Sequence, residues 1–327
     1  MTQRLDWIDR MRGFAILSVV IQHLTYSFTN DFVYHKVIGI SNMGLFFFIS
    51  GYLMVLTCRW SGFKDMLRFC GKKARTLMIP FFTWGILLPA FAFQAEWHPI
   101  TLDTLVTEWE KPHLWFLLTL VWYSLLFAVY RLVSGNVKRL GKIAVGGGIL
   151  LVFQVVMFMA WKLTGEFKLA TLYWIYFAAG IVIAELKWVR FLGNKHALSV
   201  AFLLLIACVG FWTSGATSLL NIVIKVICTF AMIVLVYNIC CLITFHHKFD
   251  EYIQLCGRES IVIYAAHWSF TEIYITQHLA LPQNELVAFG VTALFAVVIS
   301  FTCIGLHRLT KLMPAVNMLL FGEKTKL

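Results

Sequence analysis

The sequence predicts an all-α polytopic membrane protein with about ten transmembrane helices and both termini in the cytoplasm. One observation is composition: of the 327 residues, 60% are hydrophobic and only 13% are charged, and the mean hydropathy is +0.80. Soluble domains carry about 25% charged residues because their surfaces face water. The other is a succession of long apolar runs. Together they predict one integral membrane domain over 1–327.

The apolar runs have the length of helices that cross a bilayer, which need about 20 residues at ~1.5 Å rise per residue. The run at 197–214 is the weakest, and the run at 286–312 is longer than a span requires. In order, the expected spans are 11–29, 37–58, 77–94, 113–133, 143–163, 169–186, 197–214, 218–243, 259–278 and 286–312. Between them, 60–75 and 244–257 mix charged with apolar residues, which is typical of helices lying along a membrane surface.

The positive charge is distributed unevenly between the two sides of the predicted membrane. With the N-terminus in the cytoplasm, 22 of the 27 lysines and arginines fall on the cytoplasmic side; the others are Lys36, Lys111, Lys162, Lys168 and Lys225. This asymmetry is the positive-inside pattern, and it indicates an even number of spans. The net charge of +11 therefore reports membrane orientation, and a nucleic-acid partner is not expected.

The first apolar run carries two ionisable residues, Arg12 and His23, which lie eleven positions apart. In a helix this spacing is about 16 Å along the axis. A histidine inside a span is costly unless it has a partner and a task, and a neutral imidazole suits a general base. Arg12 fits either an ordinary membrane-surface anchor or a contact to a phosphate-bearing ligand from the cytoplasm.

The second run ends with Ser50-Gly51, two small residues that let a helix or a ligand approach closely. A series of basic residues follows before Pro80: Arg59, Lys64, Arg68, Lys72, Lys73 and Arg75. One interpretation is a belt that contacts lipid headgroups. The other is a cradle for a polyphosphate cofactor, with Lys73 and Arg75 nearest the membrane.

Two further runs carry candidate substrate-contacting residues. The fourth opens with His113 and Trp115, where the tryptophan fits either a membrane-interface anchor or a platform for a sugar ring. The ninth places Ser260, Tyr264 and His267 on one helix face by their spacing, with Glu272 further along. Polar groups gathered on one side of a span indicate an interior cavity.

Five of these elements, in this order, resemble the acyltransferase-3 family of integral membrane O-acyltransferases. They are Arg12…His23, Phe46-Phe47-Phe48-Ile49-Ser50-Gly51-Tyr52, the basic run Lys72 to Pro80, Leu114-Trp115-Phe116-Leu117, and Gly257…Ser260…Tyr264…His267. The resemblance covers about 5–312. Thr76 departs from the commonest pattern of the family, which has an arginine there.

The resemblance implies transfer of an acyl group, usually acetyl from acetyl-CoA as co-substrate, to a hydroxyl of a cell-envelope polysaccharide or glycolipid precursor in a bacterial inner membrane. Arg12, Lys73 and Arg75, with Arg68 nearby, would hold the CoA phosphates, and Ser50-Gly51 would admit the pantetheine arm. His23 would act as general base or be acylated transiently. The remaining candidates would contact the acceptor or line its path: His113, Trp115, Ser260, Tyr264, His267 and Glu272. Membrane lipid is the expected surrounding partner, and no metal is expected.

Another class of function fits the same residues. A proton-coupled transporter or flippase would use His23 and Glu272 as proton-relay groups. Transporters often consist of two related halves with interrupted helices, and the sequence shows no such duplication. The sequence leaves the acceptor, the acyl chain and the oligomeric state open, so a homo-oligomer is allowed.

Overall fold

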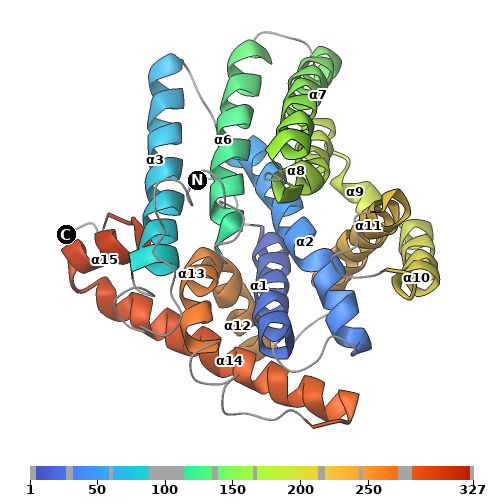
Figure 1. Cartoon of the computed structure of the whole chain (residues 1–327), viewed down its shortest axis with the longest axis vertical. Coiled ribbons are helices and arrows are strands. Elements are labelled where there is room, and N and C mark those ends of the chain that lie inside the picture. The colour runs from blue at the N-terminus through green and yellow to red at the C-terminus, as the bar shows by residue number, and fades with distance from the viewer. Residues whose placement is uncertain are drawn as a thin grey trace. The chain divides into compact units, whose positions relative to one another are not determined.

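A computed structural model describes residues 5–26, 32–58, 62–87, 114–134, 139–164, 168–212, 218–242, 246–271 and 282–324 (Figure 1). Within these ranges the regular structure is helical, and no strand is formed. The chain divides into two compact units. Unit 1 comprises Met1–Ile49 and Lys187–Gly305, and unit 2 comprises Ser50–Leu186 and Leu306–Leu327.

Unit 1 contains the first helix and most of the C-terminal half of the chain. Its helices are α1 (Asp6–Tyr26), the first part of α2 (Val33–Thr57), α9 (Val189–Leu192), α10 (Lys195–Val209), α11 (Leu219–Leu242), α12 (His247–Arg258), α13 (Ser260–Phe270) and most of α14 (Glu285–Thr310). Helices α11, α12 and α13 each pack on α1, and α10 packs on α11.

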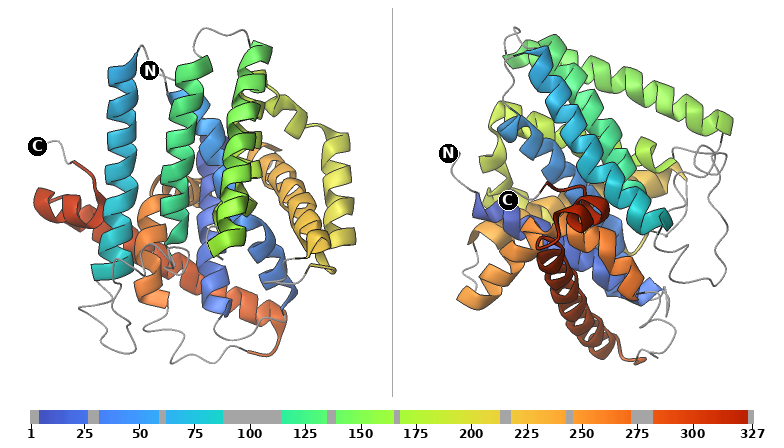
Figure 2. Two further views of the ribbon diagram at one scale, coloured as in Figure 1. Left: turned by 45° about the horizontal axis from the view of Figure 1, so that its top comes forward. Right: turned by 90° about the vertical axis from the view of Figure 1, so that its left-hand side faces the viewer.

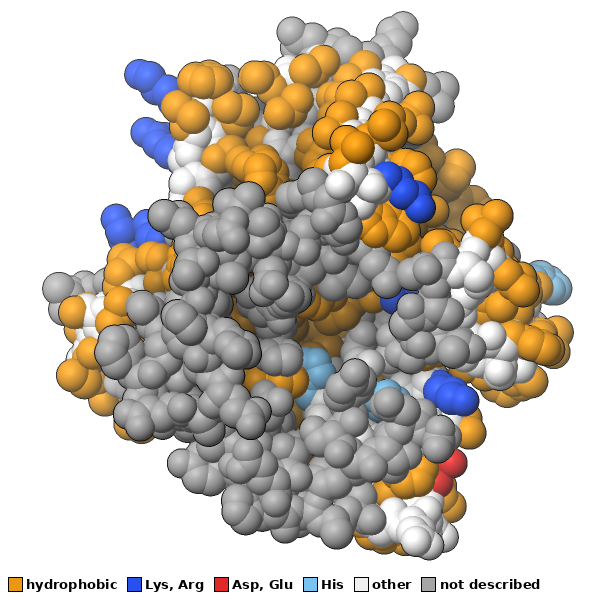
Figure 3. Space-filling view, in the orientation of Figure 1, with side chains coloured by type: hydrophobic (Ala, Val, Ile, Leu, Met, Phe, Trp, Pro, Cys, Tyr) orange, Lys and Arg blue, Asp and Glu red, His pale blue; other side chains and the backbone are white. Residues whose placement is uncertain are grey.

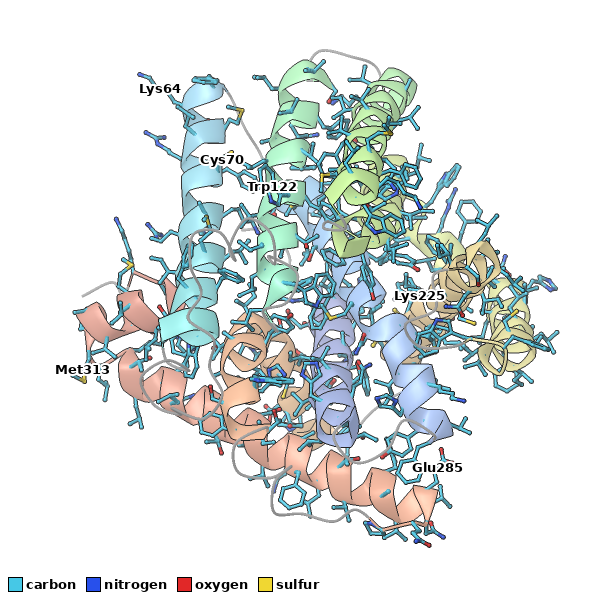
Figure 4. All side chains as sticks on the ribbon, in the orientation of Figure 1. Lys64, Cys70, Trp122, Lys225, Glu285 and Met313 are labelled. Atoms are coloured by element: carbon cyan, nitrogen blue, oxygen red, sulfur yellow. The ribbon has the colours of Figure 1, made fainter. Side chains whose placement is uncertain are left out.

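The N-terminal end of α2 is held to other helices of unit 1 by polar side chains. Glu285, at the start of α14, accepts a hydrogen bond from the backbone N–H of Tyr34 at 2.9 Å (Figure 4). This carboxylate satisfies one of the N–H groups that the first turn of a helix leaves unpaired. Further along, the Thr229 hydroxyl donates to the carbonyl of Ile40 at 2.8 Å, which joins α11 to α2.

Helices α3 (Phe63–Phe82) and α6 (Trp115–Ser134) of unit 2 lie side by side (Figure 2). The elements of unit 2 are the end of α2, α3, the π-helix η1 (Thr83–Leu87), α6, α7 (Arg139–Thr164), α8 (Lys168–Leu186), the end of α14 and α15 (Pro314–Phe321). Helix α6 packs on α3 and α7, and α8 packs on α7. Glu185 on α8 accepts from Arg131 at 3.2 Å and from the Tyr130 hydroxyl at 3.1 Å, which pins α8 to α6.

In the part of the chain that the structure describes, five helices are long and apolar enough to cross a membrane: Val33–Thr57, Trp115–Ser134, Ala144–Leu163, Leu219–Cys241 and Glu285–Thr310. They correspond to the second, fourth, fifth, eighth and tenth predicted spans. Thr171–Leu186 and Lys195–Val209 are shorter apolar helices at the sixth and seventh. The total of about ten spans and the orientation of the termini stay predictions.

The outward faces of these helices are apolar. Leu151, Val152, Val155 and Val156 on α7 are each more than half exposed. The space-filling view shows hydrophobic side chains over much of the described surface (Figure 3). A soluble protein avoids such contiguous apolar surface, whereas lipid tails cover it without cost. The helices therefore belong to a multi-pass membrane protein.

The structure contradicts one helix boundary predicted from the sequence and agrees with another. The sequence predicted a surface helix over 60–75 and a separate span from 77, but α3 runs without a break from Phe63 to Phe82. Lys, Arg, Ala, Leu and Met are strong helix formers, so the change from charged to apolar residues does not interrupt the backbone. By contrast, α12 ends at Arg258 and α13 begins at Ser260, where the sequence separated a surface helix from the ninth span.

Candidate active site

Helices α1 and α13 of unit 1 pack side by side and bring two predicted site residues together at one end (Figure 1). The Arg12 guanidinium donates from Nη2 to the Ser260 hydroxyl oxygen at 2.8 Å. Ser260 is the first residue of α13 and is buried, whereas Arg12 is half-buried. The contact joins residues 248 positions apart, and it places a guanidinium beside the first turn of α13.

At the other end of the same helix pair, two histidines face each other. Nδ1 of His23 lies 2.8 Å from Nε2 of His267, a hydrogen-bond distance. The two ring centres are 5.0 Å apart and the ring planes differ by 13°. Two imidazole rings whose centres are 5.0 Å apart can bring a pair of nitrogens to 2.8 Å only if the rings meet edge to edge. The pair is therefore joined by an in-plane hydrogen bond.

His267 is anchored by its own helix and enclosed by neighbours. Its Nδ1 lies 2.9 Å from the backbone carbonyl oxygens of both Ile263 and Tyr264. Its side chain is 1% exposed, and the Tyr264 ring centre is 5.9 Å away. Trp268 meets the His23 ring edge-on at 4.9 Å, with an angle of 87°. His23 itself is half-buried, and its contacts to His267 and Trp268 order its ring on the side of α13.

A third helix, α12, fixes the N-terminal half of α1. Arg10 makes a two-pronged contact to Asp250, with Nε to Oδ1 at 2.6 Å and Nη2 to Oδ2 at 2.8 Å. The Arg10 hydrogen bond lowers the pKa of the Asp250 carboxyl, so the ion pair is intact at neutral pH. The third guanidinium nitrogen donates to the carbonyl of Cys240 at 2.9 Å. One arginine thus ties α1 to both α11 and α12.

Glycines allow α12 to lie directly on α1. A Cβ at Gly257 would collide with the backbone carbonyl of Asp9, and a Cβ at Gly13 would collide with the carbonyl of Ile253. Two glycines on opposite helices let the backbones touch, as small residues do in membrane helix pairs. Because Gly13 follows Arg12 directly, this contact sets the position of the guanidinium.

The predicted Ser50-Gly51 element lies in unit 2, on α2. Gly51 faces the backbone of α8, where a Cβ would collide with the carbonyl of Phe177. This close helix contact requires glycine, so Gly51 has a role in helix packing. From the sequence, a role in packing and a role in admitting a ligand were equally compatible with a glycine here. Ser50 is half-buried beside it. A role of Ser50-Gly51 in admitting pantetheine stays a prediction.

The predicted cofactor-binding basic residues of α3 divide among its faces. Lys64, Arg68 and Lys72 recur every four residues and are exposed, and Figure 4 labels Lys64 where it extends from the start of α3. Figure 3 shows lysine and arginine side chains projecting at the edge where α3 lies. Arg68 also pairs with Asp65 at 3.3 Å. This row is available to anionic groups at the end of the helix.

Two other basic residues of α3 turn toward the protein. The Lys73 ammonium lies 5.8 Å from the centre of the Phe69 ring. Arg75 donates from Nε to the carbonyl of Gly322 at 3.0 Å, which caps the C-terminal end of α15. A guanidinium has five N–H donors, so this contact does not exhaust Arg75. Lys73 and Arg75 therefore do not share the exposed face of Lys64, Arg68 and Lys72.

The acceptor-side predictions are described only in part. Trp115 begins α6 in unit 2, and its ring centre lies 5.3 Å from that of Tyr173 on α8. His113 and Glu272 lie outside the described residues.

Three contributors to the site were missed by sequence reasoning: Asp250, Trp268 and the Arg10 side chain that reaches Asp250. An aspartate in the first turn of a surface helix is an ordinary capping residue, and an aromatic residue in a span is ordinary apolar surface. The opposite charges of Arg10 and Asp250 were the one feature of the sequence that is compatible with an ion pair between them. Nothing in one sequence pairs residues that are 240 positions apart.

The arrangement in unit 1 can perform acid–base chemistry. A histidine pair can accept a proton from a hydroxyl and release it later, and a buried neighbour fixes the reactive ring in one orientation. An arginine on the same helix pair, about 16 Å away by helical rise, can bind an anionic group of an extended substrate.

Comparison with known protein families identifies the family of this chain. The family model described as an acyltransferase domain, that of the acyltransferase-3 family, matches residues 5–305. A search of curated proteins and a search of solved structures found no match. The matched range begins just before α1, contains α13 and covers nearly the whole chain. The chain belongs to the acyltransferase-3 family and is a multi-pass membrane acyltransferase.

Proposed function

We propose that this protein transfers an acetyl group from acetyl-CoA to a hydroxyl of a cell-envelope polysaccharide or glycolipid precursor in a bacterial inner membrane. The donor is taken from the cytoplasm and the acceptor from the opposite side. This proposal includes about ten spans with both termini in the cytoplasm, which agrees with the positive-inside distribution of charge. The single observation that carries it is the His23–His267 pair in a member of an acyltransferase family.

In this proposal His23 takes the proton from the acceptor hydroxyl as that oxygen attacks the thioester carbonyl. Transient acylation of His23 is the other route that an imidazole allows. Support for the catalytic role comes from the half-buried His23 ring, which a buried partner and Trp268 hold in one orientation. A preorganised base of this kind contributes about 10²- to 10⁴-fold to a rate.

The charged ends of CoA require cations, and we assign this task to Arg12 and to the basic residues of α3. Arg12 is supported by its fixed position beside Ser260. Arg68 is supported by its exposure, and Lys73 and Arg75 by their positive charge at the same helix. Trp115 and His113 are assigned to the acceptor sugar, and Ser260, Tyr264, His267 and Glu272 to the path between donor and acceptor.

The test is acetyl-CoA turnover by the purified protein in lipid nanodiscs, with extracted envelope glycans as acceptor. Release of free CoA and transfer of radiolabelled acetyl are both measured. We expect His23→Ala to reduce turnover at least about 100-fold, because the base is removed. His196→Ala is the matched control, since His196 is an exposed histidine of the same unit. Its turnover should equal that of the wild type.

The melting temperature of each variant is compared with that of the wild type to exclude unfolding. Full turnover by folded His23→Ala would remove His23 from the mechanism. If acetyl-CoA neither reacts nor changes the melting temperature, and a proton gradient drives solute uptake instead, the acyltransfer proposal is wrong and the protein is a proton-coupled transporter.

A further inference from the structure

The hydrogen bonds around His267 determine which of its nitrogens carries a proton. Nδ1 of His267 faces two backbone carbonyl oxygens, those of Ile263 and Tyr264, at 2.9 Å each. A carbonyl oxygen can only accept a hydrogen bond, so Nδ1 must be the N–H donor. In the neutral ring the other nitrogen, Nε2, then carries the lone pair.

The same reasoning determines which nitrogen of His23 carries a proton. Its Nδ1 lies 2.8 Å from Nε2 of His267, and two facing nitrogens form a hydrogen bond only if one of them carries the proton. Since Nε2 of His267 is the acceptor, Nδ1 of His23 is the donor. The lone pair of a neutral His23 is therefore on Nε2.

We propose that His267 is the positioning residue of the acyl transfer: it holds His23 in the tautomer whose Nε2 is the base, and it keeps accepting the hydrogen bond from His23 while His23 carries the extra proton. This inference rests on the proposed function for its chemistry but not for its geometry. It assigns to the buried imidazole of α13 the orienting task that a carboxylate performs in other nucleophile–base systems.

The proton and electron balance of the step is complete with the two proposed substrates. The acceptor oxygen forms a bond to the acetyl carbonyl carbon, its proton moves to Nε2 of His23, and the carbon–sulfur bond breaks. The proton then protonates the CoA thiolate, so the products are the acetyl ester and CoA. While His23 holds the extra proton, its Nδ1–H still donates to the lone pair on Nε2 of His267, and this hydrogen bond stabilises the imidazolium of His23.

Burial favours this positioning role. His267 is 1% exposed, so the side chains packed around it hold its ring in one orientation. Its Nδ1–H already donates to two carbonyl oxygens, which leaves Nε2 as the nitrogen that accepts from His23. Trp268, packed edge-on against His23, restricts the ring from turning away from its partner.

The tautomer is tested first without any measurement of activity. Solid-state NMR of ¹⁵N-histidine-labelled protein in lipid bilayers distinguishes proton-bearing from lone-pair ring nitrogens, and the His23→Ala spectrum identifies the His23 signals. We expect a proton on Nδ1 and a lone pair on Nε2 of His23, with a nitrogen–nitrogen coupling across the bond to His267. A proton on Nε2 with the lone pair on Nδ1 of His23 would overturn the inference, whether or not the protein uses acetyl-CoA.

The positioning role is tested with two variants at one site. The amide oxygen of glutamine reaches the position of Nε2 and accepts a hydrogen bond, whereas leucine fills the space and accepts none. We expect His267→Leu to lower kcat about 100-fold or more with the KM for acetyl-CoA unchanged, and His267→Gln to stay within about tenfold of the wild-type kcat. Equal losses in both folded variants, or a changed KM with an unchanged kcat, would contradict the role.

The two proposals fail in different ways. Wild-type protein without acetyl-CoA turnover refutes the proposed function, while the NMR result still decides the tautomer. Turnover that depends on His23 but is indifferent to His267→Leu refutes the positioning role alone.

Discussion

At the scale of single residues, two tasks of Arg12 can be separated, one observed and one proposed. Its hydrogen bond to Ser260 joins α1 to α13, and its charge is the candidate contact for CoA phosphates. A contact that only joins helices would be lost equally by removing either partner. A contact to substrate depends on the arginine far more than on the serine.

Kinetics separate these tasks. Arg12→Ala should raise the KM for acetyl-CoA about 10- to 100-fold, because a charge-assisted hydrogen bond contributes about 1.5–3 kcal/mol. Ser260→Ala removes only a neutral partner of the guanidinium, so its KM should change less than about fivefold. Saturation of Arg12→Ala at the wild-type concentration of acetyl-CoA would remove Arg12 from donor binding.

At the scale of elements, backbone contact between helices positions the site residues. Helix α12 lies against α1 at Gly257 and Gly13, and the Arg10–Asp250 ion pair closes the same contact. In unit 2, α15 is attached through its C-terminal carbonyls. Those of Leu319 and Leu320 accept from Thr83 at 2.6 Å and from the Trp84 indole at 3.0 Å. Side-chain donors here satisfy carbonyls that a helix end leaves unpaired.

A glycine substitution tests the contact of α12 with α1. Gly257→Ala should lower the melting temperature, since an added methyl against the Asp9 backbone costs about 1–3 kcal/mol as overpacking. Gly290→Ala, in α14 of the same unit, is the matched control because its Cβ would meet nothing within 4 Å. There alanine should stabilise the helix by up to about 1 kcal/mol. Equal melting temperatures for the two variants would show that the helices do not touch at Gly257.

At the scale of the whole molecule, orientation in the membrane follows from the distribution of lysine and arginine. If the basic residues that follow the even-numbered spans face the cytoplasm, the C-terminus must lie there as well.

Reporter fusions measure this orientation. A green fluorescent protein fused after Leu327 should fluoresce, because this reporter becomes fluorescent only in the cytoplasm. An alkaline phosphatase fused there should be inactive, because this enzyme folds to its active form only on the other side of the membrane. A phosphatase fused after Asp31, between the first and second expected spans, should be active as the matched control. Phosphatase activity at Leu327 would mean an odd number of spans and an opposite placement of the C-terminus.

The amino-acid pattern alone was sufficient for the helical membrane class, for the family and for the separate identities of Arg12, His23, Ser260 and His267 as candidates. Hydropathy, charge asymmetry and short motifs are local properties, so one sequence displays them. The amino-acid pattern did not predict that α3 is continuous, that Gly51 packs against the backbone of α8, or that the Arg10 side chain pairs with Asp250. Above all, it could not join His23 to His267, because a hydrogen bond across 244 positions is created by the packing of α1 on α13. The inference about which nitrogen of His23 carries the lone pair came only from the tertiary structure, since a tautomer depends on the neighbours that packing supplies.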